Sequence, residues 1–325
     1  MAKLYPLRFT PLLKDYLWGG RRLGSLLRKS LPPEGVVAES WEICDRASEQ
    51  SVVAEGPLAG RTLGELVRDF GRELFGRHAP IERFPLLIKF LDAERSLSVQ
   101  VHPNDEQAAR LVPPDLGKSE AWVVLAAEPG SVIYAGLKPG VDRLALESAV
   151  RAGTAENCLA NIEPRVGDCI YLPAGTVHAL GAGLLVAEIQ QSSDTTYRLF
   201  DWNRVGPDGK PRALHVDEAL GAIDFNRGPV STQAPQPTER PLAERLVECP
   251  YFVLDRLQMP ANTSAPVGGD NRFHVLMLLA GAISLTHMPE SNMLQPGDVV
   301  LWPADLLPGT IRCDNPSTLL DVYLP

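Results

Sequence analysis

Short runs of Val, Ile and Leu recur along the chain, and prolines or glycines interrupt them about every eight to twelve residues. This pattern is typical of an all-β sandwich or barrel, in which tight turns join short strands. In the first part of the chain we predict strands at residues 85–90, 96–101, 121–126, 131–134, 168–172 and 184–190. Near the C-terminus we predict them at residues 252–257, 274–279, 283–288, 298–302 and 319–324.

Helical periodicity is confined to a few segments. Residues 62–77 carry an apolar stripe, and Thr62 and Glu65 have the spacing of a capping box at its start. Further helices are predicted at residues 105–111, 141–152 and 216–223. Their apolar stripes predict packing against a core.

A segment rich in proline and poor in large apolar residues, NRGPVSTQAPQPTERP, covers residues 226–241. Such a composition is hard to pack and is typical of a linker. We therefore predict a first domain at residues 1–228, a linker at 229–243 and a second domain at 244–325.

One sequence motif occurs once in each predicted domain: GDCIYLPAGTVHAL at residues 167–180 and GDVVLWPADLLPGT at residues 297–310. The Gly-Asp pair predicts a tight turn before a strand, and the Pro-Ala pair predicts the end of that strand. The second copy has Pro308 where the first has His178. The repeat predicts the same architecture twice, with an inward-facing histidine only in the first domain.

Composition and charge indicate what kind of molecule this protein binds. The chain is 45% hydrophobic and 22% charged, and no run approaches the roughly 18 apolar residues of a membrane span. Its net charge is -9, and its 31 Lys and Arg are scattered, so no nucleic-acid surface is predicted. We expect a small-molecule ligand and a monomer or weak homodimer.

The five cysteines are widely spaced, with no C-x-x-C pair, which predicts reduced structural thiols. Prolines and charges break up the first twenty residues, and no export signal is recognisable there. We therefore expect a cytoplasmic protein.

Two pairs of polar residues interrupt apolar strands. Gln100 and His102 lie two apart in one predicted strand, and Lys118 and Glu120 have the same spacing at the start of the next, so each pair shares a face. Burying these groups without partners would cost several kcal/mol. A divalent cation shared with His178 would remove that cost, and the donor set suits zinc. A hydrogen-bonded structural role is the alternative for a lone histidine at a barrel mouth.

The segment around His178 resembles the second motif of the cupin superfamily, a glycine, five residues and P-x-G-x-x-H, in which the histidine is a metal ligand. Five segments in order resemble type I mannose-6-phosphate isomerases of the short bacterial form: ESWEI, LSVQVHPND, GKSEAW, LPAGTVHAL and AEIQQSSDTTYR. The resemblance covers roughly residues 5–225. It implies a mainly β fold of two cupin-like β-sandwich (jelly-roll) domains, with a few helices inserted in the first and no metal ligands in the second.

The resemblance also implies a site. One zinc ion per chain would be held by four residues, Gln100, His102, Glu120 and His178. The family's active-site arginine falls on Arg198 and its lysine on Lys118. Ser119 stands where many members have threonine. The implied reaction interconverts mannose 6-phosphate and fructose 6-phosphate by proton transfer through a cis-enediol.

Roles within that site stay open. Lys118 and Arg198 would place positive charge on either the developing oxyanion or the phosphate. Glu188 and Asp194 are candidates for proton transfer, and orienting a ligand or Arg198 is the alternative for each.

Two other functions compete with the isomerase. A metal-dependent cupin dioxygenase usually presents an H-x-H pair with a glutamate a few residues on, whereas here Gln100 replaces the first histidine and Glu120 lies eighteen residues beyond His102. A non-catalytic sugar-binding cupin is the third possibility, because a fold does not fix a function. The complete ligand set and the two cations favour the isomerase.

The remaining histidines and two tryptophans receive structural interpretations. We expect surface or helix-end positions for His78, His215, His274 and His287. Trp18 and Trp41 are expected to pack the N-terminal strands or the wall of the site.

Overall fold

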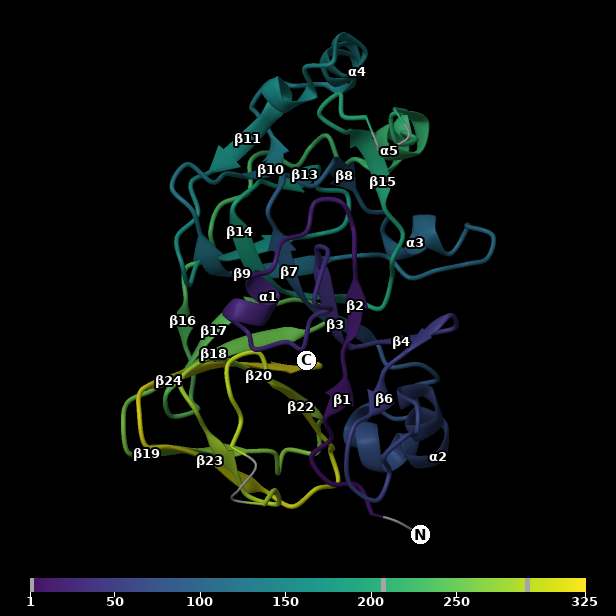
Figure 1. Ribbon diagram of the computed structural model, residues 1–325. Coiled ribbons are helices and arrows are strands. Elements are labelled where there is room, and N and C mark those ends of the chain that lie inside the picture. Colours follow the sequence, from purple (N-terminus) through teal and green to yellow (C-terminus); the bar gives the residue numbers. More distant parts are fainter. Residues whose placement is uncertain (1–2, 206–208, 290–292) are drawn as a thin grey trace. The chain divides into compact units, whose positions relative to one another are not determined.

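The structure is a computed structural model that describes residues 3–205, 209–289 and 293–325 (Figure 1). Unit 1 is made of Met1–Lys14, Arg21–Lys89 and Ala234–Pro325, and unit 2 of Asp15–Gly20 and Phe90–Gln233. N-terminal segments thus group with the C-terminal strands, which the composition of the linker did not indicate. The domain boundaries placed before residue 229 and after residue 243 stay a prediction.

In its described residues, unit 2 is a β-sandwich with three helices. Strand β7 (Leu86–Ala93) enters it from unit 1. The other strands are β8 (Val99–Val101), β9 (Glu120–Ala127), β10 (Ile133–Leu137), β11 (Leu159–Ile162), β12 (Cys169–Leu172), β13 (His178–Leu180), β14 (Leu184–Gln191) and β15 (Tyr197–Phe200). The helices are α3 (Asp105–Ala108), α4 (Arg143–Ala152) and α5 (Val216–Ala222), with a 3-10 turn η2 at Ala155–Cys158.

The five-stranded sheet of unit 2, in the order β11-β10-β13-β8-β15, has one face covered by helices α4 and α5 (Figure 1). Val99 and Val101 of β8 share a hydrophobic cluster with Leu146 of α4 and Ala219 of α5. Because side chains alternate along a strand, Gln100 projects from the opposite face, toward the inside of the sandwich. Strands β12, β9 and β14 pair in that order in the other layer.

Unit 1 contains the second β-sandwich. Its strands from the C-terminal segment are β16 (Gln236–Pro237), β17 (Ala243–Glu248), β18 (Val253–Met259), β19 (Thr263–Val267), β20 (His274–Ala280), β21 (Ser284–Leu285), β22 (Val299–Trp302), β23 (Gly309–Cys313) and β24 (Ser317–Tyr323). They form two sheets, β16-β17-β18-β24-β20-β22 and β19-β23-β21, around an apolar core. The predicted mainly β fold of two cupin-like sandwiches is confirmed.

The N-terminal segments of unit 1 add short elements. They are β1 (Phe9–Thr10), β2 (Leu12–Lys14), α1 (Arg22–Ser25), β3 (Glu39–Ile43), β4 (Asp45–Arg46), β5 (Glu49–Gln50), β6 (Val52–Val53), α2 (Leu63–Phe75) and the 3-10 turn η1 (Gly76–His78). Helix α2 begins with the predicted capping box between Thr62 and Glu65. Its Leu63, Leu66 and Leu74 are buried, as the apolar stripe predicts.

The repeated Gly-Asp motif forms the same turn in both units. Gly167 and Gly297 have φ angles of 91° and 94°, in the left-handed region that favours glycine. Each glycine donates its N–H at 2.8 Å to a carbonyl of the strand that pairs with the strand after the turn. Asp168 and Asp298 each accept a backbone N–H from three residues earlier, also at 2.8 Å. The two copies of the motif therefore share both their backbone conformation and their hydrogen bonds.

The strands after these turns extend the repeat. The order β12-β9-β14 in unit 2 corresponds to β22-β20-β24 in unit 1. In unit 2, Leu172 at the end of β12 pairs with Glu120 of β9, and in unit 1, Trp302 at the end of β22 pairs with His274 of β20. His274 thus occupies the register position that Glu120 occupies in unit 2.

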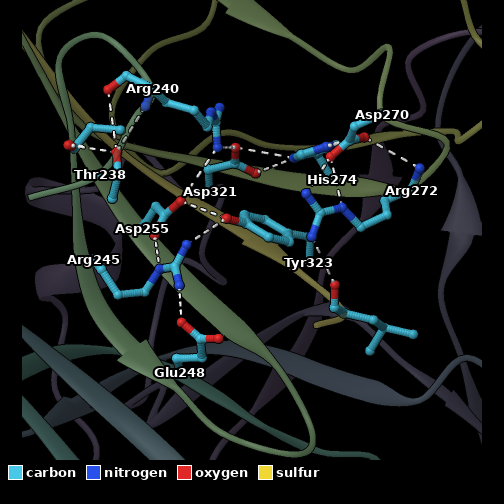
Figure 2. A network of polar contacts seen from close by, with 12 residues as sticks. Thr238, Arg240, Arg245, Glu248, Asp255, Asp270, Arg272, His274, Asp321 and Tyr323 are labelled. Carbon is cyan, nitrogen blue, oxygen red and sulfur yellow. Dashed lines mark hydrogen bonds and ion pairs between the residues drawn. The ribbon is translucent and has the colours of Figure 1, made fainter.

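His274 corrects one expectation from the sequence, because it lies neither on the surface nor at a helix end. His274 is the first residue of β20, and its side chain is 3% exposed. Its Nδ1 lies 2.9 Å from Asp321 Oδ1, and its Nε2 lies 3.1 Å from Asp270 Oδ1 (Figure 2). Its acidic partner Asp321 stands on the neighbouring strand β24, a pairing that sequence separation conceals. His78, His215 and His287 are half-buried or exposed, as expected.

All five cysteines are buried, in agreement with structural thiols. Trp18 and Trp41 are buried as well, as packing residues should be. Within the described ranges, every helix is too short or too polar to cross a membrane.

Candidate metal centre

Three potential metal ligands meet inside the sandwich of unit 2. His178 begins β13, His102 follows directly after β8, and Glu120 begins β9 in the other layer. His178 pairs with Gln100 of β8, so these two side chains leave the five-stranded sheet on the same face. The two-residue spacing of Gln100 and His102 adds His102 to that face. Local strand geometry therefore directs both histidines toward Glu120.

The three side chains are close and shielded from solvent. Nε2 of His178 lies 3.1 Å from Glu120 Oε1, and Nε2 of His102 lies 3.4 Å from Glu120 Oε2. One ligand atom from each residue can be chosen so that all lie within 4.8 Å of one another. Glu120 is fully buried, and each histidine is 1% exposed.

Backbone carbonyls set the orientation of both imidazoles. Nδ1 of His102 lies 3.0 Å from the carbonyl of Thr195, and Nδ1 of His178 lies 2.9 Å from the carbonyl of Thr176. A carbonyl only accepts, so each Nδ1 carries a proton and, in the neutral ring, each Nε2 presents a lone pair. Both Nε2 atoms face the carboxylate of Glu120, an arrangement that a cation between them would stabilise.

Charge states in the cluster suit a divalent cation. Burial and then the ammonium of Lys118 lower the pKa of His102 well below its usual value, so this imidazole is neutral. Burial opposes ionisation of Glu120, but nearby positive charge, chiefly the ammonium of Lys118, more than offsets it and holds its pKa well below the usual range. Among the described residues, neither oxygen of Glu120 accepts a hydrogen bond of good geometry. Two imidazoles and a buried carboxylate with open lone pairs form a donor set for zinc.

Gln100, the predicted fourth ligand, borders the cluster. Its Nε2 lies 3.4 Å from Nε2 of His178, and its Oε1 accepts the Ser98 hydroxyl at 3.4 Å. A half-turn of the terminal amide exchanges the two atoms without moving the rest of the side chain. The amide oxygen can therefore reach the place where the histidine lone pairs meet.

Lys118 is buried beside the ligands. Its Nζ lies 3.0 Å from Glu120 Oε2 and 3.2 Å from His102 Nε2. The sequence placed Lys118 and Glu120 on one face of a strand, and the structure brings both into one charged cluster. Lys118 thus contributes a positive charge at the centre of the site.

Arg198 stands on β15 opposite Gln100 and so belongs to the same inner face. Its Nη1 donates to the carbonyl of Ala213 at 2.8 Å. Burial, and then the charge of Arg212, lower the pKa of Arg198 from its usual value. Its buried Nε donates to no acceptor within the described ranges, which leaves a donor for a ligand.

The two predicted proton carriers have different surroundings. Glu188 of β14 is buried and accepts the indole N–H of Trp122 at 2.8 Å. Trp122 in turn contacts the ring of His178 edge-on, with ring centroids 5.3 Å apart. Asp194 is exposed in the loop between β14 and β15 and does not belong to the ligand cluster.

Sequence reasoning missed the groups that orient the ligands. The carbonyls of Thr176 and Thr195 are backbone atoms, which leave no trace in side-chain type. Asp115, whose carboxylate contacts Thr195, precedes it by 80 residues, so no local pattern links them. Trp122 could have been found, because it follows Glu120 by two residues and shares its face.

Comparison with known proteins adds independent information. The family model "Phosphomannose isomerase type I, catalytic domain" matches residues 7–119. Mannose-6-phosphate isomerase ManA of Bacillus subtilis (strain 168) is 37% identical over 260 residues, which are 80% of this chain and 81% of that protein. Mannose-6-phosphate isomerase of Streptococcus mutans serotype c is 34% identical over 307 residues, or 94% of this chain and 93% of that one.

Solved structures show a corresponding similarity. The crystal structure of the mannose 6-phosphate isomerase from Bacillus subtilis superposes with a TM-score of 0.88 at 31% identity, covering 99% of this chain and 100% of that one. A mutant of phosphomannose isomerase from Salmonella typhimurium gives a TM-score of 0.78 at 16% identity, with the same coverage of each chain, and shows a shared fold.

Proposed function

Because the chain belongs to the type I phosphomannose isomerase family, we propose that it interconverts mannose 6-phosphate and fructose 6-phosphate with one bound zinc ion. The observation that carries the metal-dependent part is the buried convergence of His102, Glu120 and His178. Proton transfer through a cis-enediol is the proposed route.

Four side chains would hold the ion: Nε2 of His102, Nε2 of His178, the carboxylate of Glu120 and the amide oxygen of Gln100. When bound, zinc would act as a Lewis acid that stabilises negative charge on the oxygens of the substrate. The carbonyls of Thr176 and Thr195 keep the imidazoles turned for this task. The layers of the sandwich exclude water from three of these ligands, because His102, Glu120 and His178 are almost fully buried.

Two cations would act on the sugar phosphate. We assign Lys118 to the end of the sugar where the proton is transferred, because its Nζ lies 3.2 Å from His102 Nε2 and 3.0 Å from Glu120 Oε2. A fixed ammonium there stabilises a developing oxyanion. Arg198 supplies a second positive charge on the same inner face, for the oxyanion or for the phosphate.

For proton transfer, the surroundings support Glu188 over Asp194. A carboxylate acts as a better base when it is removed from water, and Glu188 is 2% exposed. The indole N–H of Trp122 fixes one of its oxygens. Asp194 lies exposed in the loop after β14, where an orienting role fits its position better.

A coupled assay of fructose 6-phosphate formation, with zinc quantified on the same sample, tests the proposal. We expect chelation to abolish turnover and zinc to restore it, and we expect His178→Ala to lose both bound zinc and turnover. His287→Ala, which removes an exposed histidine of unit 1, is the matched control and should retain both. Full turnover at negligible bound metal would refute the proposal, as would oxygen consumption in place of isomerisation.

The proposal includes the setting of the enzyme. A small sugar phosphate is the partner, and neither nucleic acid nor a membrane takes part. We propose a cytoplasmic monomer or weak homodimer, which sedimentation over a range of protein concentrations tests.

A further inference from the structure

The carbonyl that orients His102 belongs to an irregular loop. Strand β14 ends at Gln191 and β15 begins at Tyr197, and Thr195 lies in the intervening segment. Its carbonyl accepts the Nδ1 proton of His102 at 3.0 Å. The position of this loop therefore decides whether Nε2 of His102 points at Glu120.

A single carboxylate oxygen from another part of unit 2 holds that loop. Oδ2 of Asp115 accepts the hydroxyl of Thr195 at 2.9 Å and the hydroxyl of Ser193 at 3.0 Å. These residues flank Asp194, so the two bonds fix the loop on either side of it.

Asp115 is itself well placed to act as an anchor. Its backbone N–H donates to the carbonyl of Ala108, the last residue of α3, at 3.1 Å. The loop is held from its other side as well, because Nε2 of Gln190 donates to the carbonyl of Ser193. Asp115 thus connects a fixed segment to the carbonyl that orients a metal ligand.

We propose that Asp115 is a positioning residue for the metal centre: it holds the Ser193–Thr195 loop so that the Thr195 carbonyl keeps Nε2 of His102 directed at the ion. This inference rests on the proposed zinc dependence. It assigns to Asp115 no contact with substrate. Its effect is on how tightly the metal is held.

The expected effect is a loss of metal affinity. Substitution of groups that orient metal ligands typically weakens binding about 10–100-fold. Asp115→Ala removes the acceptor for both hydroxyls, and we expect its zinc Kd to rise by about tenfold or more. Asp115→Asn keeps an oxygen that can accept both bonds, so it should recover most of the affinity.

The test measures the zinc Kd of the full-length protein by competition with a chromophoric chelator. Asp142→Ala is the matched control, because it removes another carboxylate of unit 2, one that caps α4 through the N–H of Ala145 at 2.8 Å. Its Kd should equal that of the wild type. Thermal melting of the metal-free proteins separates a change in stability from a change in affinity.

Two results would overturn the inference: Asp115→Ala binding zinc as tightly as Asp142→Ala, or Asp115→Asn binding as weakly as Asp115→Ala. If Asp115→Ala does not fold, Thr195→Val takes its place. It removes one hydroxyl bond, keeps the carbonyl and should also raise the Kd. A wild-type protein that binds no zinc would refute the proposed function instead, so the two failures are distinguishable.

Discussion

Raising the pH from 6.5 to 9.5 should destabilise unit 1 through His274. Burial by itself would lower the pKa of this imidazole, but Asp321 and then Asp270 more than offset burial and raise the pKa to about 9. A rise from 6.5 to about 9 corresponds to about 3 kcal/mol of folding stability, since each tenfold change in a binding constant is worth about 1.4 kcal/mol. His274 is almost fully buried, so solvent screening reduces this figure little.

The sign of the pH dependence of folding stability follows from which state, folded or unfolded, binds the proton of His274 more tightly. The folded state has the higher pKa, so the contribution is fully present below about pH 6.5, falls as the pH rises and is lost once the pH passes about 9. Two neighbouring groups of the cluster, Tyr323 and Arg240, do not titrate in this range. Burial and then a hydrogen bond to Asp255 raise the pKa of Tyr323 to about 12, and Arg240 beside Asp321 stays charged because its pKa is raised further.

Two measurements check this. Urea unfolding of the full-length protein, at several pH values from 6.5 to 9.5, compares the wild type with His274→Gln and with the exposed control His287→Gln. The wild type and the control should lose about 3 kcal/mol more than His274→Gln over this range. An NMR titration of the histidines, with His274→Gln for assignment, gives the pKa directly. Titration of His274 at or below 6.5, or equal pH dependence in all three proteins, would refute the reasoning.

Two further predictions concern the proton carrier and the repeated turn. Glu188→Gln should lower kcat by about 10²–10⁴-fold with zinc content unchanged, whereas Asp194→Asn should lower it less than about tenfold, and steady-state kinetics on zinc-loaded samples separates them. Gly297→Ala should destabilise unit 1 by more than about 1 kcal/mol in urea unfolding, because its φ is 94° and an added Cβ would lie 2.2 Å from the carbonyl oxygen of Leu27. Equal stability of wild type and Gly297→Ala would contradict the assigned turn.

The sequence predicted those features of the fold that depend on local periodicity. Alternation placed Gln100 of β8 and His102, which directly follows β8, on one face, and the capping box set the start of α2 at Thr62. The Gly-Asp repeat predicted two equivalent turns, which the φ angles confirm. Each of these signals lies within a few residues, so a single sequence contains it.

What the sequence could not predict depends on contacts between distant segments. The burial of His274 follows from Asp321, which is 47 residues away and meets it only when β20 pairs with β24. The orientation of His102 follows from the backbone of Thr195, which side-chain chemistry does not reveal. Interactions of both kinds become visible only once the sheets are assembled.

The polar cluster of unit 1 satisfies its own charges. Four cationic side chains meet four carboxylates: Arg240, Arg245, Arg272 and His274 contact Glu248, Asp255, Asp270 and Asp321 (Figure 2). Both nitrogens of His274 lie within hydrogen-bonding distance of a carboxylate. The centre of this network, Asp255, His274 and Asp321, is buried, and its charges are stable there because each has a partner of opposite sign.

The corresponding position in unit 2 lacks this balance. Glu120 takes the register position of His274, and it faces two imidazole lone pairs with Lys118 as the cation in contact with it. The proposed zinc would replace repulsion between those lone pairs and the carboxylate by attraction of both to the ion. In unit 1, Pro308 stands where unit 2 has His178, and His274 stands where unit 2 has Glu120. At the register position where unit 2 has a carboxylate of the proposed zinc site, unit 1 thus has the imidazolium of His274, and at the position of the ligand His178 it has a proline.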